Sequence, residues 1–84
     1  MPATKLDART RRAALMIGRR IQAARLAADV SQETLAAKIG MTRGNFARIE
    51  QGRTNVTLDS LIRIAEGLGM KLLLDVQARR NSHR

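Results

Sequence analysis

The chain has no cysteine, tryptophan or tyrosine, and its 84 residues include one phenylalanine, one proline and one histidine. Without cysteine there are no disulfides and no thiolate metal ligands. A domain this small must then gain stability from an aliphatic core or from association between copies. No apolar run approaches the ~20 residues that span a bilayer, and the N-terminus lacks the apolar centre of a signal peptide. These absences predict one small cytoplasmic domain.

Catalytic and metal-binding side chains are equally scarce. The one histidine, His83, lies in the polar C-terminal tail, and no two carboxylates are spaced to converge on one site. An active site needs a nucleophile, an acid–base group or a set of metal ligands held in a common geometry. We therefore expect no enzyme activity, no catalytic residues, no metal site and no cofactor.

Positive charge is what the chain has in excess. It contains 16 Lys and Arg against 7 Asp and Glu, which gives a formal net charge of +9 and a pI of about 11.8. Most of this charge lies near the two ends of the chain and between residues 43 and 53. Such an excess predicts a polyanionic partner, either nucleic acid or an anionic membrane. Membrane-surface binding is disfavoured because no large apolar face opposes the basic residues.

Three segments begin in the same way, with an apolar residue, then Ser or Thr, then a second apolar residue four positions after the hydroxyl. The three sets are Val30-Ser31 with Leu35, Met41-Thr42 with Phe46, and Val56-Thr57 with Leu61. This is the pattern of a helix N-cap with a hydrophobic staple. Glycines suited to helix ends follow at Gly40, Gly52 and Gly69. The pattern predicts helices over about 32–39, 43–51 and 58–68.

A longer helix is expected before these, within about 8–28, with Asp7 and Thr10 as alternative caps. Its apolar positions follow helical spacing at Ile17, Ile21, Ala24 and Ala28. Leu35, Phe46, Ile49 and Leu61 are the other expected core residues. The arginines of this helix, Arg9, Arg11, Arg12, Arg19 and Arg20, have two open interpretations. They form a solvated face, or they contact phosphates or a minor groove.

The pattern changes after Gly69, where Met70, Leu72, Leu74 and Val76 alternate with other residues. This alternation favours a strand over a fifth helix. An isolated edge strand promotes aggregation, so we expect it to pair with its copy in a second subunit; packing on the chain's own helices is the alternative. The predicted fold is therefore all-α, a compact bundle of four to five helices with a short C-terminal β-strand. Its expected parts are a basic N-terminal arm (1–9), a helical domain (10–69), a dimerisation strand (70–76) and a flexible basic tail (77–84).

The second and third predicted helices are joined by the short turn Gly40-Met41-Thr42, which is the arrangement of a helix-turn-helix. The stretch "SQETLAAKIGMTRGNFARIEQGRTN", with "IGRRIQAAR" before it and "TLDSLIRIAEGLGM" after it, resembles the Cro/repressor-type (XRE) helix-turn-helix family over roughly residues 17–70. The resemblance implies a lambda-repressor-like fold whose third helix enters the major groove of double-stranded DNA.

The resemblance also assigns roles to residues of this chain. It implies base reading by five residues, Thr42, Arg43, Gly44, Asn45 and Arg48. It implies phosphate binding by Gln32 at the start of the second helix and by Arg53, Thr54 and Asn55 after the third. Arg25 and Glu50 match a buried ion pair that joins the first helix to the third. Gly44 and Asp29 depart from the pattern, since Gly44 replaces a polar residue and Asp29 stands where a glycine is usual.

These features predict a homodimeric, sequence-specific transcriptional regulator that binds a palindromic operator, either a repressor or a DNA-binding antitoxin with a cognate toxin as a further partner. The ending "GLGMKLLLDV" resembles antitoxins of the family, whereas "RTNVTLDSLIRIAEGL" resembles restriction–modification controllers. A phage-type repressor is another alternative. In a different class, the chain is a protein-interaction module whose contact with DNA is incidental. Loss of operator binding when Arg43, Asn45 and Arg48 are changed together would separate the two classes.

Overall fold

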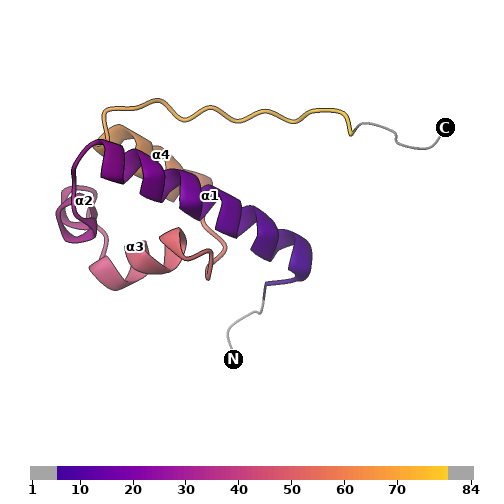
Figure 1. Cartoon of the computed structure of the whole chain (residues 1–84), viewed down its shortest axis with the longest axis horizontal. Coiled ribbons are helices and arrows are strands. Elements are labelled where there is room, and N and C mark those ends of the chain that lie inside the picture. The colour runs from indigo at the N-terminus through magenta and orange to yellow at the C-terminus, as the bar shows by residue number, and fades with distance from the viewer. Residues whose placement is uncertain (1–5, 80–84) are drawn as a thin grey trace.

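The computed structural model describes residues 6–79 and contains four helices in this part of the chain (Figure 1). They are α1 (Ala8–Ala27), α2 (Gln32–Lys38), α3 (Arg43–Glu50) and α4 (Leu58–Gly67). The predicted all-α fold is confirmed, and each helix lies where the sequence pattern placed it. Every predicted helix extended one residue too far at its C-terminal end, because that last residue is the C-cap.

Each helix begins at a side chain that accepts a hydrogen bond from a backbone N–H of the first turn. Asp7, rather than Thr10, caps α1, and its carboxylate accepts from the N–H of Thr10 at 2.8 Å. That hydrogen bond is the main reason why the pKa of Asp7 lies below its usual value. The predicted hydroxyl caps of the other helices, Ser31, Thr42 and Thr57, accept at 3.0–3.1 Å. The N-cap pattern therefore identified all three helix starts correctly.

The residues that terminate the helices adopt left-handed backbone conformations. Gly40, Gly52 and Gly69 have φ angles of 73°, 69° and 69°, and Asp29 has 59°. The conformation lets backbone N–H groups bond back to the last turn; for example, the N–H of Met41 donates to the carbonyl of Ala36 at 2.8 Å. Asp29 thus fills the position of a glycine, since a short polar side chain tolerates this region.

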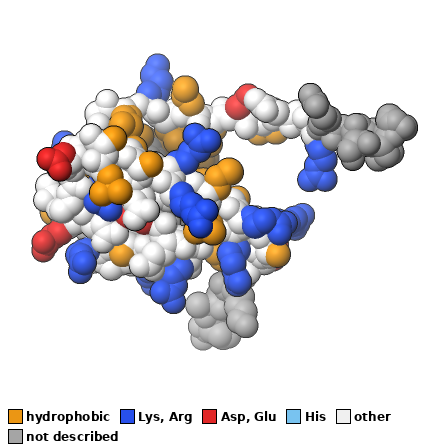
Figure 2. All heavy atoms as spheres, in the orientation of Figure 1, with side chains coloured by type: hydrophobic (Ala, Val, Ile, Leu, Met, Phe, Trp, Pro, Cys, Tyr) orange, Lys and Arg blue, Asp and Glu red, His pale blue; other side chains and the backbone are white. Residues whose placement is uncertain are grey.

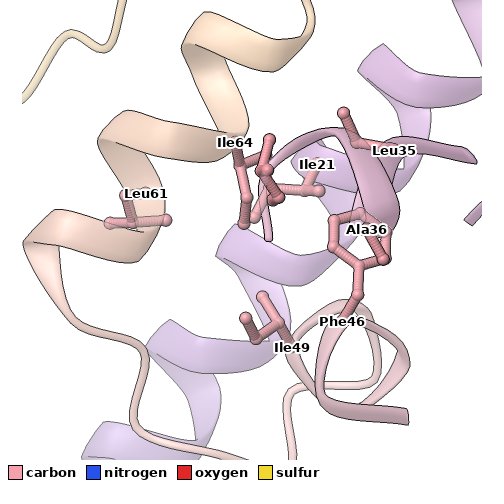
Figure 3. Packing of buried hydrophobic residues seen from close by; sticks show 8 residues of the cluster. Ile21, Leu35, Ala36, Phe46, Ile49, Leu61 and Ile64 are labelled. Carbon is pink, nitrogen blue, oxygen red and sulfur yellow. The ribbon is translucent and has the colours of Figure 1, made fainter. Parts of the chain in front are cut away.

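The core is aliphatic around a single aromatic ring (Figure 3). Phe46 and Leu35 are fully buried at its centre, with Ile64 from α4 beside them. The remaining buried members are Ile21, Ala36, Ile39, Ile49 and Leu61. The four expected core residues of the three later helices are therefore confirmed. The apolar line predicted for α1 is wrong at Ala28, which is exposed, because the helix ends just before it.

Two glycines let helix α1 lie directly against the end of α3. A Cβ added to Gly18 would come within 3.0 Å of the backbone carbonyl oxygens of Ile49 and Glu50. A Cβ on Gly52 would lie 2.6 Å from the Cα of Leu15. No larger residue fits at either position without moving backbone. These contacts set the separation of α1 from α3 and so fix the position of the C-terminal end of α3 against α1.

The segment after Gly69 is extended, but it forms no strand within residues 6–79 (Figure 1). The structure differs here from the predicted strand because a strand requires hydrogen bonds to a neighbour, and this segment has none in the described chain. Leu72 packs against the core, whereas Leu74 and Val76 are 63% and 98% exposed. The predicted β-strand is therefore absent from the described part of the chain, and pairing of this segment with a second copy stays a prediction.

Parts of the predicted terminal regions lie outside the described residues: 1–5 of the basic arm and 80–84 of the tail, the latter including His83. Residues 8 and 9 of the predicted arm belong to α1. Among the described residues, no helix combines the length and apolar character that crossing a membrane requires.

Candidate nucleic-acid interface

Helix α3 has one buried side and one polar, exposed side. Phe46 and Ile49 point into the core, and the five predicted base-reading residues are all exposed. The Thr42 hydroxyl accepts from the backbone N–H of Asn45 at 3.1 Å, so the cap uses the backbone of Asn45 and leaves its amide side chain unused. Within the described chain, the side chains of Arg43, Asn45 and Arg48 make no hydrogen bond or ion pair. Their polar groups are therefore available to an external partner.

Gly44 occupies the middle of this exposed side. A Cβ built at Gly44 meets no atom within 4 Å, so nothing inside the subunit requires a glycine here. Its φ angle is not in the left-handed region either. Glycine destabilises a helix by ~1 kcal/mol relative to alanine. Neither packing nor backbone conformation inside the subunit explains why Gly44 is present despite this cost. A close approach by an external surface would explain it.

The turn between α2 and α3 is held by a side chain of α4. Arg63 donates a hydrogen bond to the backbone carbonyl of Ile39, the C-cap of α2, and lies next to Gly40. Its guanidinium also lies 3.6 Å from the carboxylate of Asp59, one turn earlier in α4. Arg63 thereby satisfies an unpaired carbonyl at the end of a helix. Sequence reasoning missed this residue, although the Asp59–Arg63 spacing was a visible signal.

A buried ion pair ties α1 to α3 and to the loop between α1 and α2. The Arg25 guanidinium donates to both carboxylate oxygens of Glu50, at 2.6 and 3.1 Å, and to the carbonyl of Val30 at 2.8 Å. Side-chain exposure is 8% for Arg25 and 2% for Glu50. The hydrogen bonds to Glu50 raise the pKa of Arg25 above its usual value, so the guanidinium stays charged. The resemblance-based pairing of these residues agrees with this geometry.

Gln32 completes the same network. Its side-chain N–H donates to Glu50 at 2.8 Å, which links the first residue of α2 to the last residue of α3. Because one N–H is bonded to Glu50, the Gln32 amide has only its second N–H left for the predicted contact with phosphate. The structure therefore gives Gln32 a positioning role that the sequence did not suggest. It orients the two helices of the turn relative to each other.

Predicted base-reading and phosphate-binding residues meet in two surface hollows beside α3. One hollow is lined by Asn45, Arg48, Thr54 and Asn55, and it opens beside the start of α4. The other brings Arg43 together with Gln32 and Glu33. Glu33 adds a negative charge there, and sequence reasoning did not consider it. The hollow lined by Asn45 and Arg48 is accordingly more favourable for an anion than the hollow that contains Arg43 and Glu33.

The charge distribution follows this geometry (Figure 2). Lys and Arg side chains are spread over the face in view, several of them along the lower edge below α3 and at the N-terminal end of α1, whereas the few acidic side chains in view lie mainly at the end that carries α2 and on the C-terminal segment. Arg53, after α3, is exposed and contacts the side chain of Gln51 at 3.4 Å. No group of three or more His, Cys, Asp or Glu residues within 6–79 is arranged to hold a metal ion.

Comparison with known proteins places this arrangement among related domains. The family model described as a helix-turn-helix domain matches residues 17–75. The control protein C.MunI of a Mycoplasma species is 46% identical over 44 residues, which cover 52% of this chain and 60% of that protein, less than two thirds of its length. The control protein C.BamHI of Bacillus amyloliquefaciens is 38% identical over 64 residues, which cover 73% and 79%. Among solved structures, the restriction-modification controller protein C.AhdI from Aeromonas hydrophila is 31% identical, with a TM-score of 0.71 and coverage of 73% and 88%.

Proposed function

The chain belongs to the family of helix-turn-helix domains, and from this premise we propose that it is a sequence-specific DNA-binding transcriptional regulator. The observation that carries the proposal is the exposed polar side of α3, whose arginines and asparagine have no partner in the described chain while Phe46 anchors the opposite side. A helix held in this way fits the major groove. The regulator acts in the cytoplasm and uses no catalytic residue or cofactor.

Base reading falls to Arg43, Asn45 and Arg48. An arginine pairs in two places with guanine O6 and N7, and an asparagine pairs likewise with adenine N6 and N7; each such pair is worth roughly 1–3 kcal/mol of discrimination. Thr42 and Gly44 complete the surface. With no side chain at Gly44, the backbone of α3 lies closer to the base edges than any other residue would allow.

Phosphate contacts flank the reading residues. Arg53, Thr54 and Asn55 follow α3, and Thr54 and Asn55 share a hollow with Asn45 and Arg48. In the other hollow, Gln32, whose amide keeps one unbonded N–H, lies beside Arg43. Such contacts set the register of the protein on the duplex, and the base contacts then select the sequence.

We propose that the active form is a homodimer. The apolar residues of the C-terminal segment, Met70, Leu72, Leu74 and Val76, are the predicted contact, and all but Leu72 are exposed. On α4, Leu58 and Ile62 are also exposed, at 61% and 44%. Exposed apolar side chains on two neighbouring elements support burial against a second copy. Two recognition helices ~34 Å apart would then read a pseudo-palindrome.

The relatives favour one kind of regulator. Two relatives are control proteins, and one similar structure is a restriction-modification controller. We therefore rank a controller-like regulator ahead of a DNA-binding antitoxin, for which the C-terminal segment is the supporting feature. Evidence that a cognate toxin binds this chain would reverse this ranking.

The test is selection of bound sequences from a random pool of double-stranded DNA, followed by affinity measurements across salt concentrations. The proposal predicts enrichment of a pseudo-palindrome and an affinity that falls by orders of magnitude from low to physiological salt, because each dimer releases counterions from several phosphates. A pool that emerges without a shared sequence would refute base reading. It would favour a protein-interaction module with incidental contact to DNA.

A further inference from the structure

The N-terminal part of α1 extends beyond the core of the domain (Figure 1). The first buried residue of the helix is Ala14, and no residue from 8 to 13 is buried. These residues therefore add little packing energy to hold the helix together at this end. Helices of this length depend mainly on packing of a buried side, so another contribution is expected here.

The charges of this part oppose helix formation. Arg9, Arg11 and Arg12 lie in its first turns, and the first turn contains no acidic residue. A helix N-terminus carries partial positive charge, so cations near it are unfavourable. Asp7 caps the helix and lies 3.5 Å from Arg9, but no carboxylate of residues 6–79 lies within 4.0 Å of Arg11 or Arg12. These two charges destabilise the free protein, which indicates a role with an external anion.

The position of Arg11 suggests which anion. Arg11, Leu15 and Gly18 are spaced to lie along one side of α1, and the structure fixes where that side faces. Gly18 adjoins the end of α3, and Leu15 adjoins Gly52 in the loop that leads to Arg53. Arg11 is one turn further along, ~6 Å from the level of Leu15 at 1.5 Å per residue. The N-terminal end of α1 also lies on the same side of the molecule as α3, opposite the C-terminal segment (Figure 1).

We propose that Arg11 binds a DNA phosphate next to those contacted by the loop residues Arg53, Thr54 and Asn55. This inference rests on the proposed function and extends it. Arg11 adds a contact outside the sequence read by α3, on the flank of each half-site. Arginine suits the role because its guanidinium forms paired hydrogen bonds with phosphate oxygens. This contact raises affinity for any DNA sequence and leaves base preference unchanged.

The chain offers a matched pair of variants. Arg11→Gln removes one charge from the side of α1 that meets the end of α3, and Arg20→Gln removes one from the same helix further along. Arg20 lines the apolar groove next to Lys71 and Leu73 of the C-terminal segment, away from α3. Glutamine and arginine have similar helix propensity. Binding of each variant to the selected operator and to an unrelated duplex is measured between about 50 and 200 mM salt.

The first variant is expected to lower the salt slope by about 0.9 per subunit, since one phosphate contact contributes about 0.9. Between those two salt concentrations the wild type then loses ~3.5-fold more affinity per subunit than the variant. The loss should be equal on both duplexes, while the melting temperature stays the same or rises. The second variant should match the wild type.

The inference is overturned if the first variant binds with the wild-type slope, or if both variants lose the same affinity. The inference would also be overturned if the first variant bound DNA like the wild type but had lost binding to an acidic polypeptide. That result would favour a protein partner. These outcomes differ from failure of the proposed function, in which the wild-type protein itself selects no sequence.

Discussion

Replacing Gly18 by alanine tests how closely α1 approaches α3. In an isolated helix the change would be favourable by ~1 kcal/mol. In this protein the added Cβ would lie within 3.0 Å of two backbone oxygens and 2.8 Å from the carbonyl carbon of Glu50. Backbone atoms cannot rotate aside as a side chain does, so the two helices must separate. Overpacking costs about 1–3 kcal/mol, and we take the upper end because both partners are backbone.

The expected net effect is a loss of about 2 kcal/mol in the free energy of unfolding. For a domain of this size, about 1 kcal/mol corresponds to 4–8 °C, so the melting temperature should fall by about 8–16 °C. Gly44→Ala is the matched control, because a Cβ there meets nothing within 4 Å. That variant should be more stable than the wild type by about 0.5–1 kcal/mol. Thermal and urea unfolding followed by far-ultraviolet circular dichroism measure both. Equal stability of Gly18→Ala and the wild type would show that the helices do not touch there.

Three further predictions concern the ion pair, the first helix cap and the dimer. Glu50→Leu leaves the charge of Arg25 buried without a counter-charge and should cost about 3–5 kcal/mol of unfolding free energy, whereas adding Arg25→Met should restore much of it; urea unfolding that finds the double variant no more stable would contradict this. The Asp7 carboxylate has a lowered pKa when folded, so its stabilisation of α1 is present above its unfolded pKa and disappears as pH falls through the folded one. Protection of the amides at the start of α1, measured as the exchange rate relative to the intrinsic rate at each pH, should fall over that range in the wild type but not in Asp7→Ala, and identical profiles would argue against the cap. Leu74→Glu/Val76→Glu should give monomers by sedimentation that keep the helical circular dichroism of the wild type, because both side chains are exposed within one subunit; persistent dimers would exclude this segment as the contact.

Local signals made most of the fold predictable. The three hydroxyl caps, the glycines at helix ends and the staple residues are short-range features, and each acts through atoms of its own turn. The predicted helix starts and the core around Phe46 follow from them. Asp29 was also expected to accept a left-handed conformation, and its φ of 59° agrees.

Features that depend on contacts between distant residues were harder to predict. The role of Gly18 was not predicted, because it depends on two carbonyl groups of α3 that lie against it. Gln32 was expected to face phosphate, but Glu50, 18 residues away, accepts from its amide. Arg63 lies on α4, yet it caps α2. The C-terminal segment shows the same limit, since pairing of a strand requires a partner that a single chain does not supply.

The central claim is that the exposed side of α3 reads base edges. The most direct measurement is the affinity of Arg43→Ala/Asn45→Ala/Arg48→Ala for the selected operator and for an unrelated duplex, with Arg19→Ala/Arg20→Ala as a control that removes the same positive charge. The triple variant should remain folded and bind both duplexes equally, losing a preference that is typically about 10³-fold or more, while the control keeps it. A triple variant that still prefers the operator by the wild-type ratio would contradict the account.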